Sequence, residues 1–170
     1  MPEIKNVPQT ATPADRVAII SPEDETFLRE ALAEAERAAR MDEVPVGAVI
    51  VRDGQMIARA ANTREGSKCA THHAEILAIE EACRTLGGWR LPGTTLYVTL
   101  EPCPMCAGAI ANARVERVVF GAYDPKAGAY GSVFDLNALP LNHPPAVVGG
   151  CLEPECRSVL TSYFRAKRKK

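Results

Sequence analysis

The chain is organised around one segment, Leu100-Glu101-Pro102-Cys103-Pro104-Met105-Cys106-Ala107-Gly108-Ala109. A β-like run over 95–100 precedes it, and a small-residue helical run over 107–113 follows. The two thiols therefore lie three residues apart at the opening of a predicted helix. There, unpaired backbone N–H groups and the helix dipole favour thiolate over thiol. Two thiolates at this spacing can both bind one Zn²⁺.

The composition describes an ordinary globular chain. Its 170 residues suit one domain, and 46% of them are apolar and 24% charged. Six Cys are too few for a disulfide scaffold, so the C-x-x-C pair favours metal binding in a reducing compartment. No apolar run is long enough for a membrane span. We expect a cytoplasmic protein with a loosely ordered extension over 1–20, which lacks the apolar core of a signal peptide, and a folded domain over 21–170.

Charge is unevenly distributed, although the formal net charge is only −1. Residues 1–45 hold ten acidic and five basic side chains, whereas residues 111–170 hold five acidic and nine basic ones. Five of the last six residues are basic. A basic terminal helix can follow the phosphates of a nucleic acid. For the tail alone, a solvated helix end is the simpler interpretation.

The first half of the chain reads as a helix followed by a hairpin. Ser21 is a predicted N-cap before Pro22, and apolar residues recur at helical spacing to about Met41. A β-branched run over 46–51 is followed by Asp53-Gly54, which predicts a tight turn and an antiparallel return strand over 56–61.

The second half alternates strands and helices. After a polar loop over 62–71, a helix is expected from His72 or His73 to Leu86, where Gly87-Gly88 ends it. Further elements follow: a strand over 95–100, the helix after Cys103, a strand over 117–121, a mostly irregular segment over 122–142, a short strand or turn at 147–148 and a helix over 154–169. This order predicts an α/β fold, with helices on both faces of a single mixed sheet of about five strands.

His73 is the best candidate for a third metal ligand. It opens the helix that comes before the strand over 95–100, and Cys103 opens the helix that comes after this strand. Two helix N-termini can then meet at the carboxyl ends of the strands, where such sheets bind ligands. His73, Cys103 and Cys106 give the three N and S ligands of a catalytic zinc, with the fourth position left for water. Glu75 lies two residues from a ligand and is placed to act as an acid and base.

Two other kinds of site remain open at this point. Cys69, His72 or His143 could complete a closed four-ligand structural zinc, although that site would leave Glu75 without a role. A redox C-x-x-C is disfavoured, since it needs no His-x-Glu partner.

The combination of H-x-E with P-C-x-x-C is the signature of zinc-dependent nucleobase deaminases.

With these motifs, the chain resembles the bacterial tRNA adenosine deaminases of the zinc-dependent cytidine deaminase-like superfamily, over about 22–165. The resemblance rests on Val44-Pro45-Val46-Gly47-Ala48-Val49, His73-Ala74-Glu75-Ile76, 96–109, 117–122, 124–129 with Gly131-Ser132, and Leu141-Asn142-His143. It implies a three-layer α/β/α sandwich and a homodimer, with one zinc per subunit held by His73, Cys103 and Cys106. It also implies conversion of the wobble adenosine of a tRNA anticodon to inosine. Zinc hydroxide would attack C6 while Glu75, the proton shuttle, protonates N1 and then the departing ammonia.

The resemblance further implies a set of substrate contacts in the pocket and along the anticodon loop: Asn62, Val46, Ala74, Asp124, Lys126, Asn142 and His143. Without it, Asn62 reads equally well as a turn residue and Val46 as core. The chain departs from the family in carrying His72 before the ligand His, where a small residue is common, and in carrying Cys69. The remaining thiols, Cys83, Cys151 and Cys156, are interpreted as small core residues.

Two rival functions stay open. A deaminase of free guanine, cytosine or a nucleoside would share the zinc chemistry, and the basic end helix and the loop matches favour tRNA over it. A catalytically silent RNA-binding module or partner subunit would be expected to lack Glu75 or a zinc ligand, and this chain has all four residues.

Overall fold

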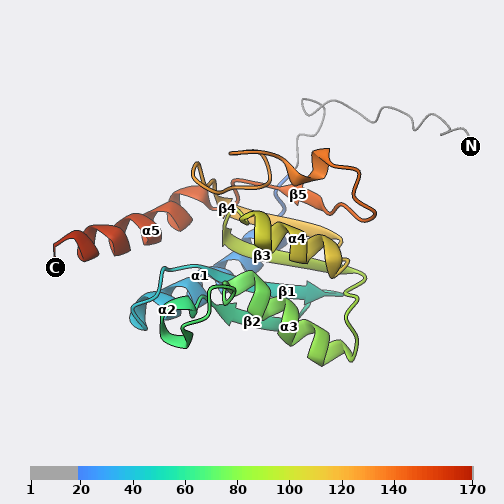
Figure 1. Ribbon diagram of the computed structural model, residues 1–170, viewed down its shortest axis with the longest axis horizontal. Coiled ribbons are helices and arrows are strands. Elements are labelled where there is room, and N and C mark those ends of the chain that lie inside the picture. The colour runs from blue at the N-terminus through green and yellow to red at the C-terminus, as the bar shows by residue number, and fades with distance from the viewer. Residues whose placement is uncertain (1–18, 170) are drawn as a thin grey trace, which may run out of the picture.

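A computed structural model describes residues 19–169, and it forms three layers around one sheet (Figure 1). The elements in chain order are α1 (Pro22–Arg40), β1 (Gly47–Arg52), β2 (Gln55–Ala61), α2 (Arg64–Ser67), α3 (Ala74–Leu86), β3 (Thr94–Leu100), α4 (Pro104–Asn112), β4 (Arg117–Ala122), η2 (Leu136–Ala138), β5 (Ala146–Val148) and α5 (Glu153–Arg168). The sheet order is β2-β1-β3-β4-β5. β1 pairs antiparallel with β2 and β3, whereas β3, β4 and β5 are parallel. The predicted mixed five-stranded sheet is confirmed.

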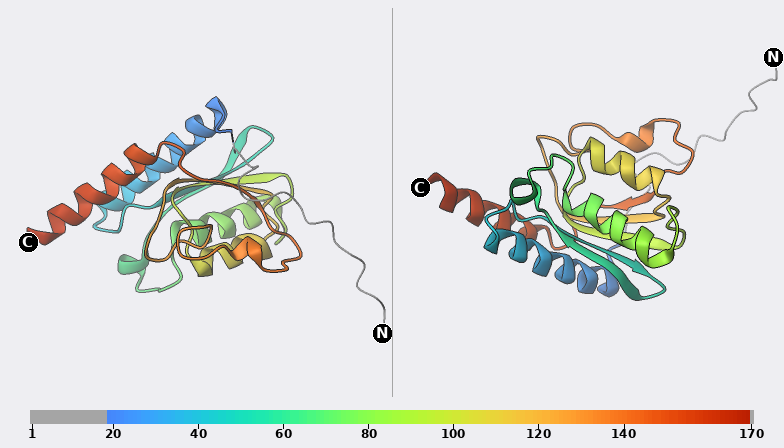
Figure 2. Two further views of the ribbon diagram at one scale, coloured as in Figure 1. Left: turned by 90° about the horizontal axis from the view of Figure 1, so that it is seen from above. Right: turned by 60° about the horizontal axis from the view of Figure 1, so that its bottom comes forward.

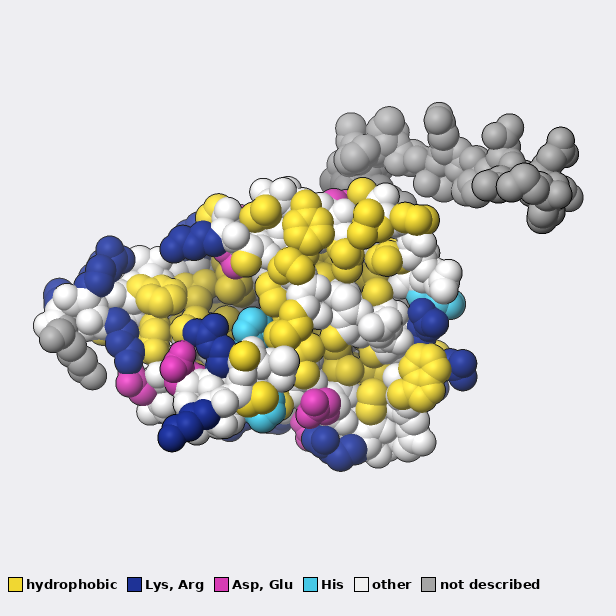
Figure 3. All heavy atoms as spheres, in the orientation of Figure 1, with side chains coloured by type: hydrophobic (Ala, Val, Ile, Leu, Met, Phe, Trp, Pro, Cys, Tyr) yellow, Lys and Arg dark blue, Asp and Glu magenta, His cyan; other side chains and the backbone are white. Residues whose placement is uncertain are grey.

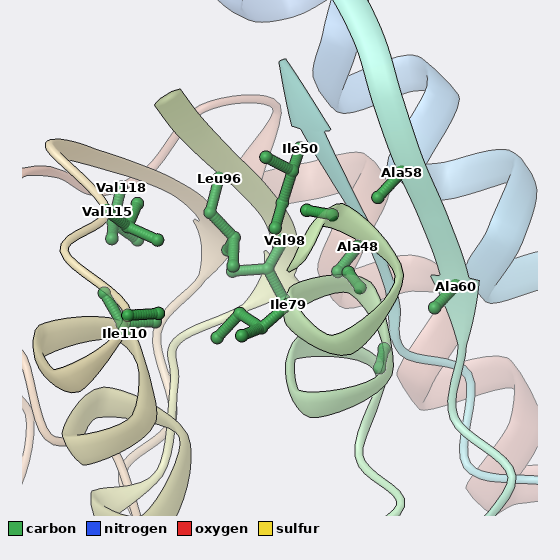
Figure 4. Packing of buried hydrophobic residues seen from close by; sticks show 14 of the residues in the cluster. Ala48, Ile50, Ala58, Ala60, Ile79, Leu96, Val98, Ile110, Val115 and Val118 are labelled. Atoms are coloured by element: carbon green, nitrogen blue, oxygen red, sulfur yellow. The ribbon is translucent and has the colours of Figure 1, made fainter. Parts of the chain in front are cut away.

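The helices cover both faces of this sheet, as Figure 2 shows from two further directions. α1 and α5 lie side by side on one face, and α3 and α4 lie on the other. Successive side chains of β1 point to opposite faces of the sheet and pack against both helix layers. Ala48 and Ile50 face α3 and α4, while Val49 and Val51 face α1 and α5. Figure 4 shows the α3 and α4 side, where Ile79 and Ile110 point toward the strands.

The hairpin and the helix ends follow the sequence signals. Asp53 and Gly54 both have positive φ, 51° and 72°, as a tight two-residue turn requires. Ser21 and Asp24 form a capping box at the start of α1. α3 ends at Gly87, whose φ of 71° is the left-handed conformation that glycine adopts without strain.

The polar segment over 62–71 differs from the prediction of a plain loop, because it contains α2. The carboxylate of Glu43 accepts hydrogen bonds from the backbone N–H groups of Glu65, at 3.0 Å, and Gly66, at 2.6 Å. It thereby satisfies the N-terminal donors of a four-residue helix from about twenty residues upstream. A second addition is η2, within the segment expected to be mostly irregular.

The expected N-terminal extension over 1–20 lies outside the described residues as far as residue 18. Within 19–169, no helix is both long enough and apolar enough to cross a membrane.

Candidate active site

The N-termini of α3 and α4 meet beyond the carboxyl end of β3 and bring three ligand side chains together. His73 is the N-cap residue of α3, and Cys103 is the N-cap residue of α4. The Nδ1 atom of His73 lies 3.6 Å from the Sγ of Cys103 and 3.5 Å from the Sγ of Cys106. Ligand atoms of all three residues lie within 4.8 Å of one another. One imidazole and two thiols form the donor set that zinc prefers, so the residues present fit this metal.

The local electrostatics favour a metal-binding thiolate at Cys103. A hydrogen bond from the Cys106 thiol lowers the pKa of Cys103 to about 4, and a hydrogen bond with His73 acts in the same direction against the effect of burial. The position of Cys103 at a helix N-terminus is consistent with this. The same contact with Cys103 raises the pKa of His73.

Glu75 lies in the first turn of α3, where its side chain is only 4% exposed. Burial raises its pKa to about 7, because the charged carboxylate is poorly solvated there. A carboxyl group with this pKa can both accept and donate a proton near neutral pH.

A pocket of about 150 Å³ opens onto these groups, lined by Val44, Val46, Asn62, Arg64, His73, Ala74, Glu75, Leu100, Glu101, Cys103, Asp124 and Ala127. It therefore contains four of the predicted substrate contacts, namely Val46, Asn62, Ala74 and Asp124. The Asn62 amide group donates to the Val44 carbonyl and accepts from the Arg64 N–H, at 3.2 and 3.4 Å. Asn62 therefore makes the local hydrogen bonds of a turn residue and also lines the pocket.

The other predicted contacts lie outside this pocket. Lys126 lines an adjoining groove of about 430 Å³. Asn142 and His143 are exposed and line a separate recess of about 280 Å³ together with Arg114 at the end of α4.

No additional ligand joins the metal group within residues 19–169. The Cys69 thiol is instead 3.3 Å from the Thr71 hydroxyl, and Nδ1 of His72 is 2.9 Å from the Ser67 hydroxyl. His143 belongs to the separate recess. The geometry therefore favours a three-ligand site over the closed four-ligand alternative. Of the three remaining thiols, Cys151 and Cys156 are buried as expected, and Cys83 is partly exposed.

Several pocket residues were not assigned a role from the sequence: Val44, Arg64, Leu100, Glu101 and Ala127. Arg64 belongs to the unpredicted helix α2, so no local signal indicated its position. Glu101 did carry a signal. It is a charged residue between an apolar strand and a metal ligand, and such a residue is rarely buried without a structural reason.

The groove beside the pocket combines apolar and basic side chains. It shares Val44, Leu100 and Asp124 with the pocket and continues along Ala122, Tyr123, Pro125, Lys126, Arg157, Leu160, Thr161, Phe164 and Arg168. Tyr123 and Phe164 are 42% and 44% exposed. Figure 3 shows this combination where α5 leaves the body of the molecule, with hydrophobic surface flanked by Lys and Arg. Exposed aromatic rings next to cations are typical of surfaces that bind single-stranded nucleic acid.

Comparisons with known proteins agree with this site. The family model described as "Cytidine and deoxycytidylate deaminase zinc-binding region" matches residues 21–122. The tRNA-specific adenosine deaminase of Bacillus subtilis (strain 168) is 54% identical over 149 residues, covering 87% of this chain and 92% of that protein. The tRNA-specific adenosine deaminase of Agrobacterium fabrum is 49% identical over 143 residues, covering 84% and 94%.

Solved structures are similar as well. A structure from work on A-to-I editing by tRNA:A34 deaminases at the wobble position superposes with a TM-score of 0.77 and 48% identity, covering 79% of this chain and 99% of that one. A guanine deaminase from Bacillus subtilis gives a TM-score of 0.56 and 44% identity, covering 58% and 64%. The chain therefore belongs to the tRNA-specific adenosine deaminases, within the zinc-dependent cytidine deaminase-like superfamily.

Proposed function

We propose that this protein hydrolytically deaminates the wobble adenosine of a tRNA anticodon to inosine. The observation that carries the chemistry is the buried Glu75 carboxyl group, in one pocket with the His73 and Cys103 side chains. A carboxyl group there is not needed to hold a structural metal, but it is needed to move protons. The choice of tRNA rests on the 54% identity to the Bacillus subtilis enzyme.

In the proposed reaction, His73, Cys103 and Cys106 hold the zinc ion. Zinc supplies a water of lowered pKa as the nucleophile for C6 of adenine. Glu75 would accept one proton of this water and donate it to N1. It would then accept the proton of the new C6 hydroxyl group and deliver it to the amino group, which leaves as ammonia while the C6 carbonyl of inosine forms. The burial of Glu75, which raises the pKa of its carboxyl group, suits a side chain that accepts and donates protons.

Val46, Ala74 and Asn62 form the walls of the base pocket in this proposal. Val46 and Ala74 are buried side chains that shape an apolar slot. The Asn62 amide contributes hydrogen-bonding capacity beyond the two backbone contacts that it makes, since an amide has two donors and two acceptor lone pairs.

The RNA strand on either side of the flipped base is proposed to follow the groove toward α5. Lys126 and Arg168 would contact phosphates, and Tyr123 and Phe164 would stack on unpaired bases. Asp124 stands at the junction of the pocket and the groove. Asn142 and His143 would contact a more distant part of the anticodon arm.

The test of this function compares substrates on one preparation of the purified protein. Inosine formation is measured on an anticodon stem-loop with adenosine at the wobble position and on the same stem-loop with that adenosine moved one nucleotide. Xanthine formation from free guanine and uridine formation from cytidine are measured alongside. We expect deamination of the wobble adenosine alone. Deamination of guanine or cytidine would instead assign the chain to the deaminases of free bases or nucleosides, to which the structurally similar guanine deaminase belongs.

A homodimer in the cytoplasm completes the proposal. Val133, Phe134 and Leu139, in the segment between β4 and β5, are 54%, 40% and 53% exposed, and apolar side chains exposed in this way favour association. Light scattering coupled to size exclusion should give about twice the 18.3 kDa of the chain. A mass equal to one chain at micromolar concentration would contradict the dimer. The cytoplasmic location follows from the tRNA substrate, and six free cysteines are consistent with a reducing compartment.

A further inference from the structure

Glu101, the residue that follows β3, binds a single loop through almost all of its hydrogen-bonding capacity. Its side chain is 1% exposed. Oε2 accepts the backbone N–H of Asp124 at 3.0 Å, and Oε1 accepts the N–H groups of Tyr130 at 3.0 Å and Ser132 at 3.1 Å. The Ser132 hydroxyl also donates to Oε2. We refer to residues 124–132 as the Glu101 loop.

The loop passes so close to the carboxyl group that one position must be glycine. A Cβ atom on Gly128 would lie 2.3 Å from both Cδ and Oε2 of Glu101, far inside van der Waals contact. On the other side of Glu101, the Ala129 N–H donates to the Pro102 carbonyl at 2.9 Å. The Glu101 loop is thus fastened to the turn that leads into the metal ligand Cys103.

Backbone dipoles, not a cation, stabilise this carboxylate. None of the ion pairs formed within residues 19–169 includes Glu101. A buried carboxylate is expensive unless it accepts several hydrogen bonds, and several converging N–H groups can meet that requirement. Loss of the carboxylate would conversely leave the loop N–H groups of Asp124, Tyr130 and Ser132 without an acceptor.

The loop that Glu101 fastens forms part of the substrate surface. Asp124 and Ala127 line the metal pocket, and Tyr123, Pro125 and Lys126 line the groove beside it. Glu101 therefore links two parts of the site that are about twenty residues apart in the chain: the metal-bearing turn and the wall that faces the substrate.

We propose that Glu101 is a positioning residue for the deamination, which holds the Glu101 loop in register with the metal-bearing turn so that the pocket binds the flipped nucleoside. It acts through the loop and does not touch the reacting atoms. This inference rests on the proposed function for its substrate, whereas the attachment of the loop can be measured without any substrate.

The first variant is Glu101→Gln, which keeps the shape of the side chain but replaces one acceptor oxygen with a donor facing backbone N–H groups. We expect KM for the wobble-adenosine stem-loop to rise far more than kcat falls, with a loss in kcat/KM of about 100-fold. Zinc content should stay at the wild-type level. Hydrogen exchange at the amides of Tyr130 and Ser132 should become faster.

Glu116→Gln is the matched control. Glu116 is an exposed Glu just before β4 that accepts one backbone N–H, from Gly93 at 2.8 Å. It lies at the amino end of β4, whereas Glu101 follows the carboxyl end of the parallel strand β3. The change in charge and shape is identical, so KM, zinc content and loop exchange should all remain at wild-type values.

Ser132→Ala is a milder second variant, in case Glu101→Gln does not fold. It removes only the hydroxyl donor, so we expect KM to rise about tenfold with no loss of zinc. In the double variant Glu101→Gln/Ser132→Ala, the two effects on KM should not add, because both substitutions remove the same contact between Glu101 and its loop.

The outcomes separate the two claims. If the wild-type protein deaminates only free guanine, the proposed function fails, and faster loop exchange in Glu101→Gln would still support the positioning role. If Glu101→Gln folds with unchanged KM and unchanged loop exchange, the positioning role is wrong. A loss of zinc in proportion to activity would also overturn it, since Glu101 would then serve only the metal-bearing turn.

Discussion

Cys106 and Cys156 test the metal assignment at the level of single side chains, because both thiols are buried and only Cys106 belongs to the metal group. Cys106→Ser should lose zinc during dialysis against a chelator, with an affinity at least about tenfold lower, since a hydroxyl is a poor zinc ligand. Cys156→Ser should keep its zinc. Metal analysis per chain measures both, and equal zinc in the two variants would contradict the assignment.

The grouping of the His73, Cys103 and Cys106 side chains could be predicted from local spacing. His-x-Glu and Pro-Cys-x-x-Cys each begin a helix, so a short motif fixes both the residue types and their position. Glu101 and Arg64 could not be placed in this way. The contacts of Glu101 are with a loop more than twenty residues further along the chain, and Arg64 lies in a short helix that Glu43 caps from about twenty residues upstream. Asn142 and His143 were predicted as contacts, and the structure places them in a recess separate from the metal pocket.

Asp24 joins α1 to the sheet, and its environment makes this connection dependent on pH. The carboxylate accepts hydrogen bonds from Arg117 of β4, at 2.6 and 2.8 Å, and from the Tyr97 hydroxyl of β3, at 3.1 Å. Burial alone would raise the pKa of Asp24. The hydrogen bonds from Arg117 and Ser21, and the charge of Arg117, outweigh burial and lower the pKa from 3.8 to about 2.

Asp24→Asn should therefore destabilise the protein by about 2 kcal/mol at pH 7, the free-energy equivalent of this pKa difference. The folded pKa lies below the unfolded one, so the contribution is complete above pH 4 and is lost as the pH falls toward 2. Urea unfolding at pH 7 and pH 3 measures this difference. Glu23→Gln, at an exposed position in the same turn, should change the unfolding free energy by less than about 0.5 kcal/mol at both pH values. An Asp24→Asn effect that does not shrink with falling pH would contradict the ion-pair account.

Elements were predictable where a local signal determines them. Asp53-Gly54 and Gly87 require backbone conformations that few other residues adopt, so the hairpin and the end of α3 agree with the prediction. α2 was not predictable, because the carboxylate that caps it comes from Glu43, outside the segment. The parallel pairing of β3 with β4 agrees with the strand–helix–strand order, because α4 connects these two strands.

On the scale of the whole molecule, α5 projects from the body and carries the basic end of the chain (Figure 1). Lys126 and Arg168 line the groove between this helix and the Glu101 loop. If the RNA follows this groove, Lys126→Gln/Arg168→Gln should weaken stem-loop binding and reduce the slope of log K against log salt by about one unit for each lost phosphate contact.

Arg84→Gln/Arg90→Gln is the matched double variant. Arg84 is in the last turn of α3, and Arg90 follows that helix in the chain. The carboxyl end of α3 lies on the side of the molecule away from α5 (Figure 1). This double variant removes the same amount of positive charge and should leave the slope of log K against log salt unchanged. Equal loss of slope in the two double variants would indicate a general charge effect and would contradict the groove as the path of the RNA.

Single-turnover deamination by Glu75→Gln at full zinc occupancy measures whether Glu75 transfers the protons of the reaction. The variant keeps the size of a buried side chain and removes only its capacity to transfer a proton. We expect wild-type zinc content, wild-type binding of the stem-loop, and a rate of inosine formation lower by about 10²–10⁴-fold. A zinc-loaded variant that forms inosine at the wild-type rate would show that Glu75 is not the proton shuttle, and the proposed mechanism would be wrong.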